Sequence, residues 1–176
     1  DARTFNIALQ CRSTAYMRLL FVKRALAWPR SSGHDVHTYY MMRACAEQGH
    51  DVALATVDEP TSVAIDGLRL AARFSLDVPS VASASAAEPI VATNLQRRFR
   101  RYWGVPESQL VTLRDTVWAF RPDAAIVVGL EVLSYFPALS GTTRVWYAAD
   151  EWVLHHLSMI RPRSRTIRED IYAAAV

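Results

Sequence analysis

The chain has 176 residues, 51% of them hydrophobic and 10% aromatic, so it can bury a core as a single globular domain and is not expected to be disordered. No apolar run approaches the roughly 20 residues needed to span a bilayer, which excludes a transmembrane helix. The formal net charge of +3 suits an anionic partner without requiring one, and two cysteines, too few for a disulfide framework, fit a reducing cytoplasm.

The first legible elements form one strand–helix–strand unit. A short apolar run over 18–23 predicts a strand, a helix follows over 34–48 and stops at Gly49, and a second strand is predicted over 52–57. If the two strands are parallel, the loop between the first strand and the helix lies at the carboxyl edge of the sheet, where such sheets bind ligands. One stripe of the helix groups Val36, Tyr40 and Ala44.

The middle of the chain is less regular. A third strand is expected within Gly67–Phe74, and the Ser-, Ala- and Pro-rich stretch 77–89 is expected to be a loop. One helix is predicted over 90–103 and another over 106–120. This part therefore connects the first strands to the rest of the sheet.

The last third returns to alternating strands and helices. The run Ala124–Val128 is continuously apolar, which is typical of a buried parallel strand. A short helix is expected after Glu131, a last strand over Arg144–Ala148 and a helix over Asp150–Met159. The alternation predicts an α/β protein with a Rossmann-like, doubly wound parallel sheet.

The helix predicted over 90–103 has one apolar face and one basic face. In the plainer interpretation, the apolar face packs on the core and the basic face lies in water. In the other, the basic face attracts anionic lipid and brings the protein to a membrane surface. Nucleic acid is not expected as a partner, since aromatic and basic residues segregate instead of interleaving. The basic face consists of Arg97, Arg98, Arg100 and Arg101.

Short polar or glycine-containing segments follow three of the predicted strands. The chain has neither the G-x-G-x-x-G fingerprint of dinucleotide-binding domains nor the P-loop of NTPases. The three segments should open on one crevice at the carboxyl edge of the sheet. They comprise Ser31, Ser32, Gly33, His34, Gly129, Leu130, Glu131, Ala149, Asp150, Glu151 and Trp152.

The order of three motifs resembles a known family. The motifs are Pro-x-x-Ser-Gly at 29–33, Glu-Gln-Gly-His-Asp-Val at 47–52 and Arg-Pro-Asp-x-x-x-Val-x-Gly-Leu-Glu at 121–131. Over roughly 17–160 the chain resembles the N-terminal domain of retaining glycosyltransferases of family 4, which have the GT-B fold. It is most similar to the subgroup found in bacterial exopolysaccharide clusters.

The resemblance implies a division of labour between two domains. In that family the N-terminal domain mainly binds the acceptor, and the C-terminal domain binds the nucleotide-sugar and supplies two Glu separated by seven residues. No Glu in this chain is followed by another at that spacing. We therefore expect the donor-binding domain to be absent, a domain over 17–176 after an extension of uncertain structure over 1–16, and no activity from the chain alone.

The resemblance also implies the reaction and its partners. A sugar would move from a nucleotide-sugar to a glycan or lipid-linked acceptor with retention, by front-face transfer and with no covalent nucleophile in this half. The protein would be cytoplasmic, with a peripheral contact on the inner face of the membrane, and would use no cofactor. The rival hypothesis is a non-catalytic Rossmann-like binding or interaction module.

The site residues are assigned partly by position, because this chain departs from the family pattern. The family often has Gly-Gly in the first loop and histidines after the fourth and fifth strands; here Gly33-His34, Glu131 and Asp150 stand at those places. The expected catalytic residues are Glu131 and Asp150. The expected substrate-binding residues are Ser32, Gly33, His34, Gly129 and Glu151.

Each assignment has a structural alternative. Gly33 either lets backbone N–H groups approach a diphosphate or acceptor at a helix N-terminus, or simply starts the helix with Ser31 and Ser32 as caps. Asp150 suits an N-cap, and Glu131 suits the first turn of a helix, where an acid interacts favourably with the helix dipole. Their carboxylates could instead orient an acceptor hydroxyl or take its proton.

The histidines do not indicate a metal site. Glu151 and His155 share a helical face at i, i+4, but no third ligand is visible, so no metal is assigned. His37 lies one turn after His34 and is expected to face solvent or the cleft.

Overall fold

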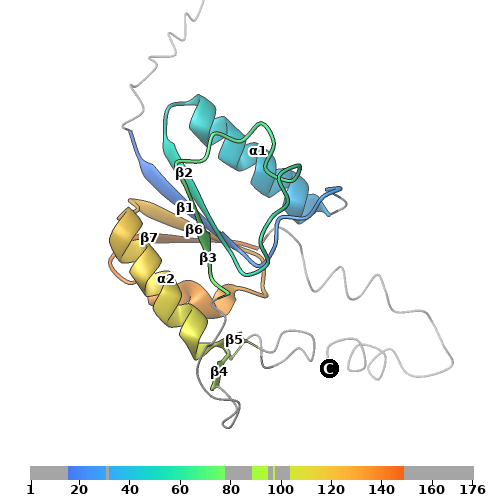
Figure 1. The fold of residues 1–176 in the computed structure, drawn as a ribbon. Coiled ribbons are helices and arrows are strands. Elements are labelled where there is room, and N and C mark those ends of the chain that lie inside the picture. The colour runs from blue at the N-terminus through green and yellow to red at the C-terminus, as the bar shows by residue number, and fades with distance from the viewer. Residues whose placement is uncertain (1–15, 31, 78–88, 95–96, 98–103, 149–176) are drawn as a thin grey trace, which may run out of the picture.

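The computed structural model describes residues 16–30, 32–77, 89–94, 97 and 104–148 (Figure 1). These residues form a five-stranded sheet in the order β3-β2-β1-β6-β7, and every neighbouring pair in it is parallel. The predicted Rossmann-like, doubly wound α/β fold is thereby confirmed. The strands are β1 (Arg18–Lys23), β2 (Asp51–Thr56), β3 (Ala72–Ser75), β6 (Ala124–Val128) and β7 (Thr143–Tyr147).

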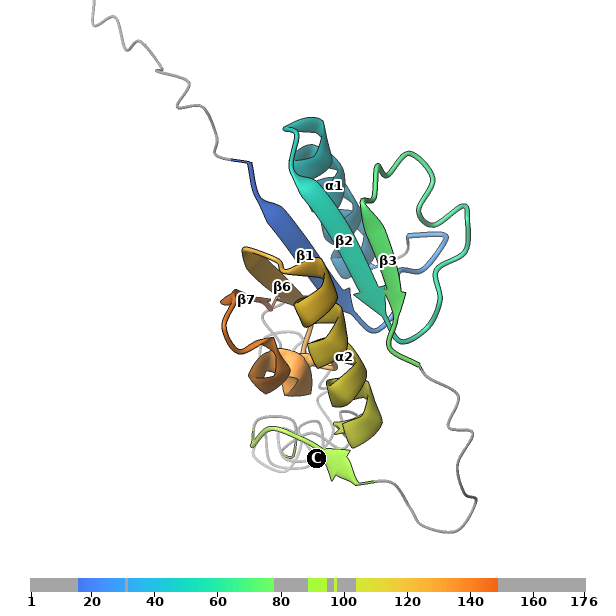
Figure 2. The ribbon, with the colours of Figure 1, turned by 60° about the vertical axis from the view of Figure 1, so that its left-hand side comes forward.

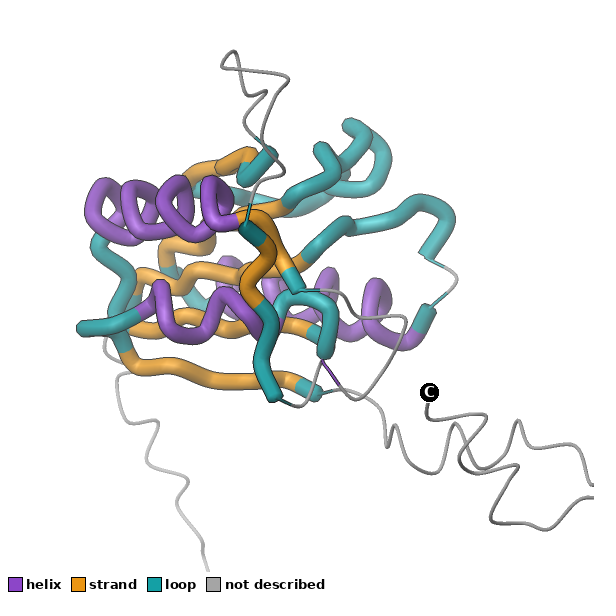
Figure 3. The backbone as a smooth tube through the Cα atoms, turned by 90° about the horizontal axis from the view of Figure 1, so that it is seen from below, coloured by secondary structure: helices purple, strands orange, loops and turns teal. Residues whose placement is uncertain are grey.

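Helices cover both faces of the sheet. Helix α1 (Gly33–Glu47) lies on one face, and α2 (Glu107–Phe120) with the 3-10 helix η2 (Leu133–Leu139) lies on the other (Figures 1 and 2). Figure 3 shows the layer of strands between helices on its two sides.

The two faces of the sheet bury alternating side chains of the same strands. Side chains alternate along a strand, so successive residues of β1 enter different clusters. Phe21 packs in the cluster that contains Met42 of α1, whereas Leu20 packs in the cluster that contains Leu113 of α2 and Tyr135 of η2. Burial on both faces explains why β1 and β6 are continuously apolar in sequence.

The topology places a switch point at the centre of the sheet. From β1 the chain runs outward through β2 to β3, then returns to form β6 on the other side of β1. Leu19 of β1 is therefore in register with both Val52 of β2 and Ala124 of β6. The loops after β1 and β6 lead to helices on opposite faces, and the carboxyl ends of strands at such a switch point are where open parallel sheets generally bind ligands.

The helix predicted over 90–103 is wrong at its start. Ile90–Val91 form β4, which pairs antiparallel with β5 (Val105–Pro106). β-branched residues favour such pairing. Gly104 permits it, because a Cβ there would lie only 2.2 Å from the Val91 carbonyl oxygen. Of the four arginines assigned to a basic face, only Arg97 lies within the described residues; it is exposed, and its N–H donates to the Thr93 carbonyl at 3.1 Å.

One other expectation is corrected, and α1 buries a side that the sequence did not indicate. The third strand is only Ala72–Ser75, because turns precede it and end at Gly67, whose φ is +76°. The stripe expected along α1 is not its buried side: Tyr40 is 57% exposed. The helix instead buries Asp35, Thr38, Tyr39 and Met42.

Candidate functional site

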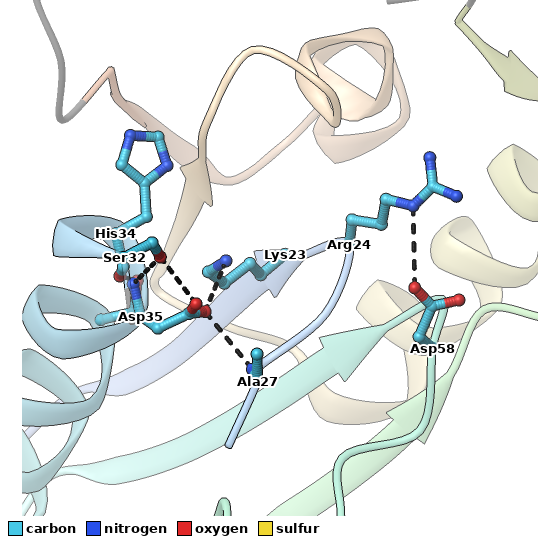
Figure 4. Close-up of polar contacts among 8 residues, drawn as sticks. Lys23, Arg24, Ala27, Ser32, His34, Asp35 and Asp58 are labelled. Carbon is cyan, nitrogen blue, oxygen red and sulfur yellow. Dashed lines mark hydrogen bonds and ion pairs between the residues drawn. The ribbon is translucent and has the colours of Figure 1, made fainter. Parts of the chain in front are cut away.

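The loop between β1 and α1 ends in a helix cap. The Ser32 hydroxyl accepts the backbone N–H of Asp35 at 3.1 Å and donates to Asp35 Oδ2 at 2.6 Å (Figure 4). The capping interpretation of Ser32 is therefore confirmed. Gly33 is the first residue of α1, and a Cβ built on it would meet nothing within 4 Å. Within the described residues, no close contact requires glycine there; Ser31 lies outside them.

A buried ion pair underlies this cap. Lys23, the last residue of β1, lies 2.9 Å from Asp35 Oδ1, and the two side chains are 12% and 7% exposed. Asp35 also accepts the N–H of Ala27 at 3.4 Å. Asp35 thus joins the strand end, the loop and the helix start, as the dashed lines in Figure 4 show.

The environment of Asp35 favours its charged form. Burial alone would raise its pKa, but the hydrogen bond from Ser32 and the interaction with Lys23, together with the Ala27 N–H, outweigh that cost and lower the pKa below its usual value. The carboxylate is therefore ionised at neutral pH and neutralises Lys23. Its oxygens are engaged within the protein, so Asp35 supports the loop rather than offering a free base.

His34 brings the start of α1 against the loop that follows β6. A Cβ built on Gly129 would lie 3.5 Å from His34 Nδ1, so the imidazole and this glycine are direct neighbours. Gly129 has φ +95°, a left-handed conformation that favours glycine. Its N–H donates to the Tyr147 carbonyl at 3.0 Å, and its carbonyl accepts the Trp146 Nε1–H at 3.1 Å. Segments from β1, β6 and β7 therefore meet here.

A second histidine strengthens this junction. His37 Nδ1 lies 2.6 Å from the Tyr147 hydroxyl, at the carboxyl end of β7. His37 is exposed, as expected from the sequence. Together His34 and His37 place two imidazoles from the first turns of α1 over the ends of β6 and β7.

The other predicted site residues are only partly described. Glu131 is exposed and lies in the turn between β6 and η2, two residues after Gly129. Asp150, Glu151 and His155 lie outside the described residues, so the structure does not test their roles. The same holds for Arg98, Arg100 and Arg101, and the membrane-surface patch stays a prediction.

The described segments contain no group of three or more His, Cys, Asp or Glu residues arranged to hold a metal ion. Within the same segments, every helix is too short or too polar to cross a bilayer. A surface pocket of about 460 Å³ lies at the ends of β2 and β3, and the residues that line it are not among those predicted for the site. Its lining includes Thr56, Glu59, Arg73 and Ser75.

Lys23, Asp35 and Tyr147 were not anticipated as neighbours of the site. Two signals for the first pair are present in the sequence: Lys23 is the only lysine and ends an apolar strand, and Asp35 follows the cap Ser32 by three residues, the spacing of a reciprocal cap. Nothing local in the sequence indicates that Tyr147 would reach α1.

The fold and the junction define the class of protein: an α/β protein with a Rossmann-like parallel sheet and polar loops gathered at its switch point. No protein-family model matches the sequence, and no curated protein is significantly similar to it.

Proposed function

We propose that this chain is the acceptor-side half of a retaining glycosyltransferase with the GT-B fold. One observation carries the proposal: α1 begins at the switch point, with His34 against Gly129 and Glu131 two residues further on. Loops from different strands thereby meet where open parallel sheets bind their ligands. The reaction, sugar transfer with retention, is proposed from the order of sequence motifs, which resembles that of family 4 glycosyltransferases.

The roles follow from position. Ser32, Gly33, His34, Gly129 and Glu151 would line the substrate site. Glu131 or Asp150 would orient the attacking acceptor hydroxyl or accept its proton. The bond between the donor sugar and its phosphate breaks, and the diphosphate leaves with the electron pair. The acceptor oxygen forms the new glycosidic bond on the same face of the sugar.

The Lys23–Asp35 pair would hold the loop after β1 in one conformation. Pre-ordering a loop reduces the conformational entropy that a ligand must remove on binding. Since Asp35 is saturated by its own protein partners, it would act by positioning and not by contact with the substrate.

An observation also favours the second candidate, a non-catalytic binding module. The polar groups of Ser32 and Asp35 serve a structural network, and Gly33 is not needed for any described close approach. A junction of loops at the carboxyl edge of a parallel sheet can bind a ligand without performing chemistry.

An assay with two proteins separates the candidates. The 176-residue chain and the full-length product of its gene are each incubated with a panel of nucleotide-sugars and glycan acceptors. We expect transfer by the full-length product and none by the chain alone. Turnover by the chain alone would overturn the division into two halves, and no transfer by either protein would favour the binding module.

Variants then locate the chemistry. In the full-length product, Gly33→Val should abolish most turnover, because a bulky side chain would block the close approach of substrate to the backbone. It should leave the unfolding midpoint nearly unchanged, because the space around its Cβ is open. Glu131→Gln should lower turnover, and Asp150→Asn tests the second carboxylate while keeping a capping side chain. Full activity in both carboxylate variants would contradict the proposed roles.

A further inference from the structure

The loop between β1 and α1 displays an aromatic ring on the protein surface. Trp28 is 51% exposed, although a large apolar side chain is usually buried. Ala27, the residue before it, donates its N–H to Asp35, so the base of this loop segment is tied to the network described above. The exposed indole is therefore part of a supported loop.

One face of the indole is already occupied. The guanidinium carbon of Arg30 lies 4.5 Å from the centre of the Trp28 ring, within the range of a cation–π interaction. The same carbon lies 3.5 Å from the centre of the Tyr39 ring. Arg30 thus contacts one ring that is exposed and one that is buried.

The connection between β2 and β3 holds both Arg30 and Tyr39 in place. An Arg30 terminal nitrogen donates to the Ala64 carbonyl at 3.0 Å, and the Tyr39 hydroxyl donates to the Asp66 carbonyl at 2.6 Å. Arg30 Nε is buried and has no hydrogen-bond partner among the described residues. Its guanidinium is therefore held by one hydrogen bond and by stacking on two rings, and the connection between β2 and β3 anchors the stack.

We propose that Trp28 is the stacking platform for a pyranose ring of a glycan. A pyranose has one face of C–H groups and a rim of hydroxyls, so its apolar face matches the face of the half-exposed indole that Arg30 does not cover. The proposal rests on the proposed function only for the statement that this glycan is the acceptor.

The size of the surface favours a sugar over a protein or a membrane. A stable protein interface buries about 800 Å² on each partner. Here the exposed apolar residues of the loop are Ala27, Trp28 and Pro29, with one indole among them, which is the scale of one sugar residue. Lipid binding would require a larger apolar area or a cluster of cations.

The direct test follows the indole signals. The ¹⁵N-labelled 176-residue chain is titrated with maltose, cellobiose and lactose, and the indole N–H resonances are assigned with single Trp→Phe variants. We expect at least one disaccharide to shift the Trp28 resonance and to leave that of Trp118 unchanged. Trp118 is the matched control, because it is 75% exposed but lies near the end of α2.

Variants test the contribution of the ring. Trp28→Ala should weaken disaccharide binding at least tenfold, Trp28→Phe should weaken it less, and Trp118→Ala should bind like the parent chain. Because Trp28 is half exposed, its variants should retain the parent circular dichroism spectrum. No shift of Trp28 by any disaccharide at high millimolar concentration, or undiminished binding by Trp28→Ala, would overturn the platform.

Kinetics separate this inference from the proposed function. In the full-length product, Trp28→Ala should raise the KM for the acceptor and leave the KM for the nucleotide-sugar unchanged. An unchanged acceptor KM in an active enzyme would reject Trp28 while sparing the transferase assignment. Sugar binding through Trp28 in a protein that transfers nothing would reject the transferase assignment and keep the platform.

Discussion

Lys23 and Asp35 join the end of β1 to the first turn of α1 through an ion pair of 2.9 Å, with side chains only 12% and 7% exposed. The pair lies under the loop that carries Trp28 and the cap Ser32. Its position makes it a structural support of the proposed site, because Asp35 also bonds to Ser32, one of the predicted substrate-binding residues.

Asp35→Asn should destabilise the protein by roughly 3 kcal/mol, because it leaves the Lys23 ammonium largely buried without its charge partner. Urea unfolding followed by circular dichroism measures the change. The control is Glu47→Gln, which breaks the Arg43–Glu47 pair on the surface of α1, where the side chains are 49% and 59% exposed. The control should cost less than about 0.5 kcal/mol. Equal losses in the two variants would show that burial of the first pair contributes nothing.

The same pair should make stability depend on acid pH. The pKa of Asp35 is lower in the folded protein than in the unfolded chain, so its contribution is fully present above the unfolded pKa of about 3.9. It is lost as pH falls through the folded pKa, when the carboxylate takes up a proton. Unfolding free energies measured from pH 7 downward should therefore fall more steeply for the parent than for Asp35→Asn. Parallel curves would contradict the lowered pKa.

Tyr135 offers a test on the other face of the sheet. Its side chain is fully buried, and its hydroxyl donates to Gln109 Oε1 of α2 at 2.5 Å. Tyr135→Phe should cost about 1–3 kcal/mol, since it leaves the buried amide oxygen without this donor. Thr112→Ala, which removes an exposed hydrogen bond to the Ser108 carbonyl on the same helix, should cost less.

Burial also raises the pKa of the Tyr135 phenol. In a spectrophotometric titration of the folded protein, Tyr135→Phe should therefore leave the alkaline phenolate transition unchanged near the usual tyrosine pKa. A loss of amplitude there would show that the phenol is accessible to water.

The glycines that start α1 and follow β6 should respond oppositely to alanine. Gly129→Ala should lower stability by about 1–2 kcal/mol, because φ is +95° there and L-residues rarely adopt it. Gly33→Ala should raise stability by about 0.4–1 kcal/mol, since its Cβ would enter open space and the unfolded chain would lose freedom. Thermal unfolding of the two variants provides the comparison. A loss in Gly33→Ala would indicate a constraint on the loop that the described contacts do not reveal.

The regular parts of the fold could be predicted from the sequence because their signals are local. The apolar runs of β1 and β6 identify strands buried on both faces, and Ser32 and Gly49 mark the ends of α1. The buried side of α1 could not be predicted in this way because it includes polar residues: Asp35 pairs with Lys23, and the Thr38 hydroxyl donates to the His34 carbonyl. Hydrophobic periodicity does not report such burial.

The site was predictable to a smaller extent. Parallel strands bring their carboxyl ends together, so the segments that contain His34 and Gly129 were expected at one edge of the sheet. In the structure these two residues are direct neighbours. The partners that fix the geometry are distant in sequence: His37 and Tyr147 are separated by 110 positions. The helix predicted over 90–103 was wrong at its start, because Ile90 and Val91 pair with a segment beyond residue 103. Helical periodicity cannot show such a tertiary contact.

The central position of β1 has a consequence for how the molecule folds. Arg18 pairs with Asp51, 33 positions away, whereas Leu19 pairs with Ala124, 105 positions away. Closing the longer loop costs about 1 kcal/mol more in chain entropy, so the β1–α1–β2 unit should form first and β6 should join it later. Pulse-labelled hydrogen exchange during refolding should therefore protect the amides of β2 before those of β6. On this order of events, the contact between His34 and Gly129 is among the last to form, and truncation before residue 124 would leave a partly folded chain with one flank of its central strand open to other chains.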